Sequence, residues 1–230
     1  MNARIVAAAL LLACSSAGHA HEAERPHRGP ADNYVYELAA PGSYELPPIK
    51  RAADGKVRDE TGAPRRLAEI TRGKITMMSF VYTQCVDLCP LATMRMALFQ
   101  DLVAGQPDLA RDVRLVTMSF DPVRDTPERM AEQAALWRAD AGPEWLFVTS
   151  PDEASLQPVL AAYDQGVVAV PGPDGAEASL SHVLRVFLID ADGVIRNIYS
   201  ADFLDPRLML NDVLTLRGAG GTVTVTAPSE

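Results

Sequence analysis

Apolar and polar positions alternate along the chain in blocks that predict strands and helices in turn. Continuous short apolar runs, typical of strands buried on both faces, cover 75–81, 113–120 and 145–149. Apolar residues recur at helical spacing in the segments between and after these runs. The segments expected to be helical are 90–104, 127–139, 150–163 (or 152–163) and 206–217.

Turn residues divide the rest of the chain. The segments 183–189 and 194–200 flank Asp190-Ala191-Asp192-Gly193, which predicts a β-hairpin. Glycine-containing turns between 44 and 67 predict a smaller hairpin before the first core strand. The stretch 164–181 is expected to be irregular, and a connection of this length is usually functional or mobile.

The order of these elements predicts the fold class. Strands that alternate with helices imply right-handed crossovers and an α/β sheet with helices on both faces. A pair of cysteines at the end of the first core strand, followed at once by a helix, is the thioredoxin-like arrangement. We therefore expect a thioredoxin-like three-layer fold with a central mixed sheet.

The first twenty residues predict an export signal. Arg4 precedes an apolar core at 5–13 and small residues at 15–20. The apolar core is too short to span a bilayer, which takes about twenty residues. Cleavage after Ala20 is one prediction. The alternative is cleavage before Cys14, because Leu11-Leu12-Ala13-Cys14 resembles a bacterial lipobox and Cys14 would then carry a lipid anchor.

Residues on either side of the predicted domain, 46–217, show no core-forming pattern. The polar segment 21–45 contains proline and glycine and is expected to be a linker, and 218–230 is expected to be a loose tail. We expect the protein to be exported to a bacterial periplasm. Its only contact with a membrane would be a lipid on Cys14.

Composition and charge narrow the functional classes. Hydrophobic residues make up 48% of the chain, enough for a sizeable core, and the formal net charge is −9. This charge argues against nucleic acid as a partner, because phosphate binding needs a basic face. Once Cys14 is assigned to the leader, Cys85 and Cys89 are the cysteines of the domain. In an oxidising compartment such a pair indicates a structural disulfide, a redox site or a metal site.

The position of the two cysteines favours chemistry over a structural role. Pro90 is expected at the first helical position, where its missing N–H needs no partner, so Cys89 lies at or beside the helix N-cap and the helix dipole stabilises its thiolate. Closing so small a loop removes little chain entropy. Three intervening residues would let the sulfurs close as a disulfide or separate around a soft metal ion.

His182 is the candidate third metal ligand. The other histidines precede residue 46, and His21 and His27 are expected to be solvated linker residues. His182 is expected to begin a strand at the end of the irregular stretch, from which it could reach the dithiol. A lone histidine is more often a packing or surface residue, but two thiolates and an imidazole suit copper in either oxidation state. Structural zinc would require four protein ligands.

Three groups of residues together resemble the Sco/SenC family over about 65–216. They are Thr83-x-Cys85-x-Asp87-x-Cys89-Pro90, then Ser119-Phe120-Asp121-Pro122-Val123-Arg124-Asp125-Thr126-Pro127, then His182 ahead of Leu188-Ile189-Asp190-Ala191-Asp192-Gly193. The resemblance implies a tethered, thioredoxin-like copper protein. Such proteins deliver copper, Cu(I) or Cu(II), to the binuclear copper centre of cytochrome c oxidase, or keep the cysteines of that centre reduced. Val86 and Ser181 depart from the family pattern, which usually has proline and often has aspartate there.

The resemblance also implies a ligand set and partners. The copper ligands would be Cys85, Cys89 and His182. The partners would be the copper-bearing subunit of cytochrome c oxidase, or another copper acceptor, and an upstream thiol reductase. The alternative to this metallochaperone is an exported thiol–disulfide oxidoreductase that uses Cys85 and Cys89 without copper, with His182 tuning a pKa. A peroxide reductase would need a Pro-x-x-x-Thr-x-x-Cys segment, which is absent.

Overall fold

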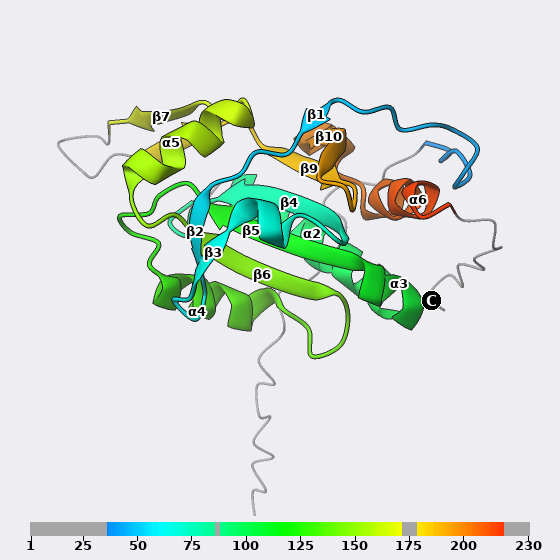
Figure 1. Ribbon diagram of the computed structural model, residues 1–230, viewed down its shortest axis with the longest axis horizontal. Helices are drawn as coiled ribbons and strands as arrows, with labels where there is room; N and C mark the ends of the chain where they lie inside the picture. The colour runs from blue at the N-terminus through cyan, green and yellow to red at the C-terminus, as the bar shows by residue number, and fades with distance from the viewer. Residues whose placement is uncertain (1–35, 86–87, 172–178, 219–230) are drawn as a thin grey trace, which may run out of the picture. The chain divides into compact units, whose positions relative to one another are not determined.

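The computed structural model describes residues 36–85, 88–171 and 179–218 (Figure 1). The predicted export signal, Cys14, His21 and His27, and the tail 219–230 lie outside these residues. An eight-stranded sheet has the strand order β1-β10-β9-β4-β5-β6-β2-β3. Its strands are β1 (Lys50–Arg51), β2 (Lys56–Asp59), β3 (Pro64–Arg66), β4 (Ile75–Val81), β5 (Val113–Ser119), β6 (Glu144–Thr149), β9 (Arg185–Ile189) and β10 (Val194–Ser200).

The sheet is mixed, as predicted. Strands β4, β5 and β6 pair in parallel, whereas β9 pairs with β4 and β10 with β9 in antiparallel fashion. Every residue of β4 is buried, because this strand has neighbours on both edges and helices over both faces. The predicted hairpins are confirmed: β2 pairs with β3, and the turn between β9 and β10 contains Gly193 at φ +77°.

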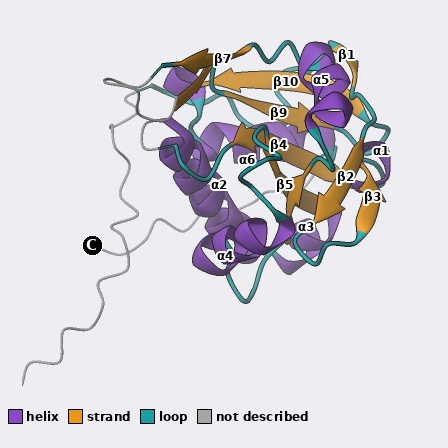
Figure 2. Cartoon of the chain, turned by 90° about the vertical axis from the view of Figure 1, so that its left-hand side faces the viewer, coloured by secondary structure: helices purple, strands orange, loops and turns teal. Residues whose placement is uncertain are grey.

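Helices cover both faces of the sheet (Figure 2). They are α1 (Leu67–Ile70), α2 (Leu88–Ala104), α3 (Pro107–Asp112), α4 (Pro127–Trp137), α5 (Glu153–Ala162) and α6 (Pro206–Leu216), with a 3₁₀ turn at Ala201–Phe203. One core cluster takes its helical residues from α2, α3, α4 and α6, and the other mainly from α1 and α5. Met77 of β4 faces the first cluster, and Met78 faces the second. This is the predicted three-layer, thioredoxin-like α/β fold.

The helix starts follow local sequence signals, with one shift. Thr126 caps α4 by accepting from Arg129 N–H at 3.4 Å, and Asp152 caps α5. Helix α2 begins at Leu88 and not at Pro90. Pro90 is tolerated in the first turn because the first four N–H groups of a helix have no acceptor within it. The short helix α3 was not predicted.

The expectation of irregular structure over 164–181 is wrong in part. Strands β7 (Val167–Val170) and β8 (Ser179–His182) pair antiparallel and form a separate two-stranded sheet. His182 therefore ends a strand, where we had expected it to begin one. The two strands are ordered by pairing with each other, for example Val167 with His182. This pairing could not be predicted, because neither strand has a periodic pattern of apolar residues. Residues 172–178, between the two strands, lie outside the described part of the chain.

The last part of the predicted linker is hydrogen-bonded to α6. The Tyr36 hydroxyl donates to Asp205 Oδ2 at 3.1 Å, and the Tyr44 hydroxyl donates to Asp212 Oδ1 at 2.5 Å. Asn211 Nδ2 donates to the Ala39 carbonyl at 2.9 Å. Burial and the contact with Asp212 raise the pKa of Tyr44 to about 12. Residues 36–45 are thus held against the C-terminal helix.

Candidate metal-binding site

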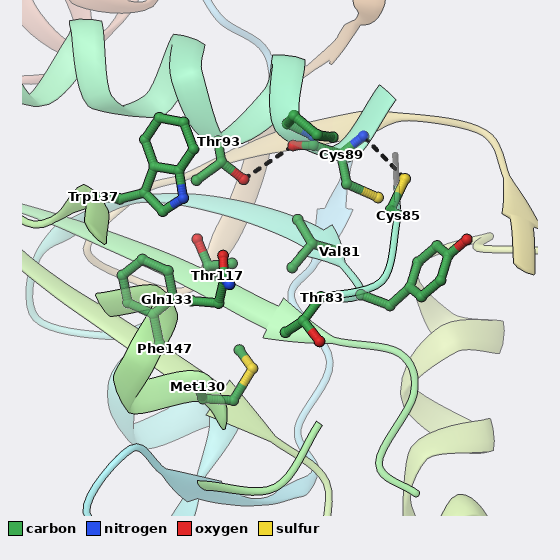
Figure 3. Close-up of a pocket in the computed structure, with 12 residues that line it drawn as sticks. Val81, Thr83, Cys85, Cys89, Thr93, Thr117, Met130, Gln133, Trp137 and Phe147 are labelled. Carbon is green, nitrogen blue, oxygen red and sulfur yellow. Dashed lines mark hydrogen bonds between the residues drawn. The ribbon is translucent and has the colours of Figure 1, made fainter. Parts of the chain in front are cut away.

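The two cysteines lie where β4 ends and α2 begins (Figure 3). Both are free thiols; Cys85 is half-buried, and Cys89 is 4% exposed. The Cys85 amide donates to the Tyr82 carbonyl at 3.2 Å, which turns the chain back after the strand. The Cys89 amide donates to Cys85 Sγ at 3.4 Å. The sulfur of Cys85 therefore serves one of the first-turn N–H groups of α2, which have no acceptor within the helix.

His182, the last residue of β8, lies close to Cys89. Its Nε2 lies 3.7 Å from Cys89 Sγ, and the centroids of the His182 and Phe120 rings are 4.4 Å apart. Residues separated by 93 positions in the sequence are thus brought together as predicted. His182 Nδ1 is buried, and the backbone of Val183 lies close enough to the ring to act on its pKa.

The three predicted ligands are near one another, but they do not form a closed set. Within the described residues, no three His, Cys, Asp or Glu side chains converge as ligands around a single metal ion would. Cys89 and His182 face each other, whereas Cys85 Sγ points to the Cys89 amide. A three-ligand site would require these three side chains to move closer together around the ion. The donor set of two thiols and one imidazole fits copper chemically.

Burial dominates the electrostatics of the site. It raises the pKa of the Cys89 thiol, and the neighbouring Cys85 adds to the increase. Burial and Cys85 thus oppose the stabilisation of the Cys89 thiolate that we expect from the helix N-terminus. Burial lowers the pKa of His182, so the imidazole is neutral near pH 7 and has a lone pair available for a metal.

The segment 121–125 fastens the loop that leads to Cys85. The Asp125 carboxylate accepts from Thr83 N–H at 3.0 Å, from Thr83 Oγ1 at 2.6 Å and from Ser119 Oγ at 2.5 Å. Asp125 is fully buried, and burial raises its pKa. Arg124 pairs with Asp121 at 2.6 Å. The segment thus holds the loop before Cys85 and also leads into the Thr126 cap of α4.

Sequence reasoning missed Tyr82 and Phe120. The Tyr82 hydroxyl accepts a hydrogen bond from Leu180 N–H at 3.3 Å, and its ring lies 5.1 Å from that of Phe120. Tyr82 directly follows the predicted strand, so its burial was foreseeable. Its partner is 98 residues away, and no local pattern could have indicated it.

A small pocket of about 70 Å³ opens beside the dithiol. Besides the two cysteines, it is lined by residues of α2, β5 and α4, among them Thr93, Thr117 and Trp137 (Figure 3). Thr93 Oγ1 donates to the Cys89 carbonyl at 3.0 Å. This hydrogen bond joins the first turn of α2 to the next one.

Comparisons with known proteins agree on one family. The family model described as SCO1/SenC matches residues 56–217. The SCO1 protein homolog of Bacillus subtilis is 24% identical over 165 residues, which are 71% of this chain and 78% of that protein.

Two solved structures show the same fold. One is Arabidopsis thaliana ScoI with copper bound, with a TM-score of 0.63 at 19% identity, covering 73% of this chain and 98% of that one. The other is BsSco, described as a member of the Sco family of cytochrome c oxidase assembly proteins with a disulfide switch. Its TM-score is 0.59 at 20% identity, covering 76% of this chain and 98% of that one. None of the helices among the described residues is both long enough and apolar enough to span a bilayer.

Proposed function

The chain belongs to the SCO1/SenC family, and from this membership we propose that it is a copper-binding protein that holds the metal between Cys85, Cys89 and His182. The observation that carries the proposal is the 3.7 Å separation between Cys89 Sγ and His182 Nε2. A thiolate and an imidazole bound to the same metal ion lie about that far apart, given metal–sulfur and metal–nitrogen distances of roughly 2.3 and 2.0 Å. Copper bound to the solved Arabidopsis relative supports the choice of metal.

We propose further that the protein is a metallochaperone. Copper is its cargo, and the acceptor is the copper-bearing subunit of cytochrome c oxidase or another copper protein. The description of BsSco as an oxidase assembly protein supports this acceptor. In this scheme an upstream thiol reductase keeps both cysteines reduced, the thiols lose protons as the metal binds, and the acceptor takes the copper by ligand exchange. Export to the periplasm, with or without a lipid on Cys14, would place the chain beside such an acceptor.

Copper loading of the mature protein under reducing conditions tests this function. We expect one copper ion per chain. Tight binding should be lost in Cys85→Ser and in Cys89→Ser, since each removes a soft ligand, and weakened in His182→Ala. His27→Ala is the matched control, because it removes a histidine of the predicted linker and should bind copper as the wild type does. Undiminished binding in both cysteine variants would contradict the proposal.

The alternative of a thiol–disulfide oxidoreductase is favoured by the unequal exposure of the two free thiols. Cys85 is accessible for attack on a disulfide, and the buried Cys89 could resolve the mixed disulfide. Insulin reduction in vitro, with His182→Ala as the comparison, separates the two functions. Rapid reduction that His182→Ala leaves unchanged would favour the oxidoreductase. We expect slow reduction by the wild type.

A further inference from the structure

His182 lies on a part of the chain that the main sheet does not hold. Strands β7 and β8 form their own two-stranded sheet, and His182 is the last residue of β8. A two-stranded hairpin by itself is marginally stable at best. On β7, Val168 and Val170 are 63% and 44% exposed, so this face of the hairpin gains little from burial. The position of the imidazole therefore depends on contacts between β8 and the domain.

Tyr82 makes such a contact through its side chain. Its hydroxyl oxygen accepts the hydrogen bond from Leu180 N–H at 3.3 Å, two residues before His182. Only 7% of Tyr82 is exposed, and a hydrogen bond in such surroundings has little competition from water. The Tyr82 ring also lies 5.1 Å from the ring of Phe120, which in turn lies 4.4 Å from the imidazole.

The backbone of Tyr82 holds the other half of the site. Its carbonyl accepts from the Cys85 amide at 3.2 Å and so shapes the turn that presents the first thiol. The adjacent Val81 carbonyl accepts from the Phe120 amide at 2.9 Å. One residue thus contacts the strand that carries the histidine, the ring that packs on the histidine, and the loop that carries Cys85.

We propose that Tyr82 is the positioning residue that sets His182 relative to Cys85 and Cys89. The Tyr82 hydroxyl fixes the position of β8 relative to the two thiols, and the Tyr82–Phe120 pair limits rotation of the imidazole. Tyr82 acts through these neighbours and does not itself bind metal. The inference rests on the proposed function, since it treats His182 as a copper ligand.

Tyr82→Phe tests the inference because it removes the hydroxyl and leaves the ring in place. Tyr163→Phe is the matched control: Tyr163 is 1% exposed, belongs to the same core cluster, and its hydroxyl lies near the backbone of Ala53, outside β8 and the dithiol loop. In the copper-free protein, NMR would follow hydrogen exchange of the Leu180 amide and the cross-peaks between the His182 ring and the Cys89 β-protons. We expect faster exchange and weaker cross-peaks in Tyr82→Phe, and wild-type values in Tyr163→Phe.

A second readout uses the loaded protein. The copper dissociation constant should rise about tenfold in Tyr82→Phe, as is usual when a group that orients a ligand is lost, and the sulfur-to-Cu(II) absorption band should shift. Phe120→Leu provides a second variant, because it keeps the Tyr82 hydroxyl but removes the aromatic ring beside His182. It should also raise the copper dissociation constant and shift the absorption band.

Two results would separate the possible failures. Unchanged Leu180 exchange and unchanged His182–Cys89 cross-peaks in Tyr82→Phe would overturn the positioning role. A wild-type protein that does not bind copper would instead refute the proposed function, and the copper-free measurements would still decide the role of Tyr82.

Discussion

At the scale of single residues, the site depends on side chains that fasten loops as much as on the thiols and the imidazole. Asp125 is the clearest case. Fully buried, it accepts hydrogen bonds from the Thr83 amide and from the hydroxyls of Thr83 and Ser119, and so joins the loop after β4 to the loop after β5. These donors offset part of the cost of burying its charge, and burial still raises its pKa.

Replacing Asp125 should therefore destabilise the whole domain. Asp125→Ala leaves the Thr83 amide and two hydroxyls without their acceptor, and we expect a loss of about 3 kcal/mol in the free energy of unfolding. Asp125→Asn should cost less, because its carbonyl oxygen still accepts. Urea denaturation measures both. The exposed Asp140 is the control position, and Asp140→Ala should change stability by less than about 0.5 kcal/mol. Equal midpoints for Asp125→Ala and the wild type would contradict this account.

Residue type and spacing predicted much of the site, but not how it is held together. Cys85 and Cys89 were identifiable because they lie between an apolar run and a helical pattern, and His182 because the other histidines precede the domain. The contact between Cys89 and His182 confirms that they are neighbours. The roles of Tyr82 and Asp125 could not be predicted, because each acts through a partner supplied by tertiary folding.

At the scale of elements, long periodic segments were predictable and short ones were not. Strand β4 and helix α4 carry strong local signals, namely a continuous apolar run and a Thr-Pro cap. Helix α3 spans Pro107–Asp112, which is too short to show a helical period. Strand β8 contains two serines, and its order comes from pairing with β7 and not from its own propensity.

The turn that contains Gly55 packs closely against Val159 of α5, and this packing can be tested. A Cβ at Gly55 would lie 2.4 Å from Val159 Cγ2, and Val159 is 1% exposed. The extra methyl group in Gly55→Ala must push the turn away from α5, at a cost of about 1–3 kcal/mol. Gly166→Ala is the control, since nothing lies within 4 Å of its Cβ position; it should be neutral or slightly stabilising. Thermal unfolding of both variants gives the comparison, and equal melting temperatures would contradict the packing argument.

At the scale of the whole molecule, the chain carries a net charge of −9, yet several of its carboxylates are locally stabilised. Burial by itself would raise the pKa of Asp59, but hydrogen bonds from Thr61 and Ala63 hold it below the usual range. Burial would likewise raise the pKa of Asp205, but the contacts with Arg207 outweigh burial and lower it. Asp125 is the exception, with a raised pKa. Repulsion among the negative charges would make the fold more stable at acid pH, where carboxylates are protonated. These local contacts make it more stable at neutral pH.

The local contacts should win, because each acts at hydrogen-bond distance while the general repulsion is screened by salt. A carboxyl group with a lowered folded-state pKa contributes stability above its unfolded value, near 3.9 for aspartate, and this contribution disappears as the pH falls through the folded value. We therefore expect the free energy of unfolding to decline below about pH 4. A separate decline between about pH 7 and pH 5 should come from His182, because its lowered pKa keeps the folded imidazole neutral while the unfolded one takes up a proton. Asp59→Asn isolates one contribution. It should be less stable than the wild type at pH 7, and the gap should narrow as the wild-type carboxylate becomes protonated. Urea denaturation at a series of pH values measures the gap, and one that stays constant down to pH 2 would show that the charge on Asp59 contributes nothing to the stability of its turn.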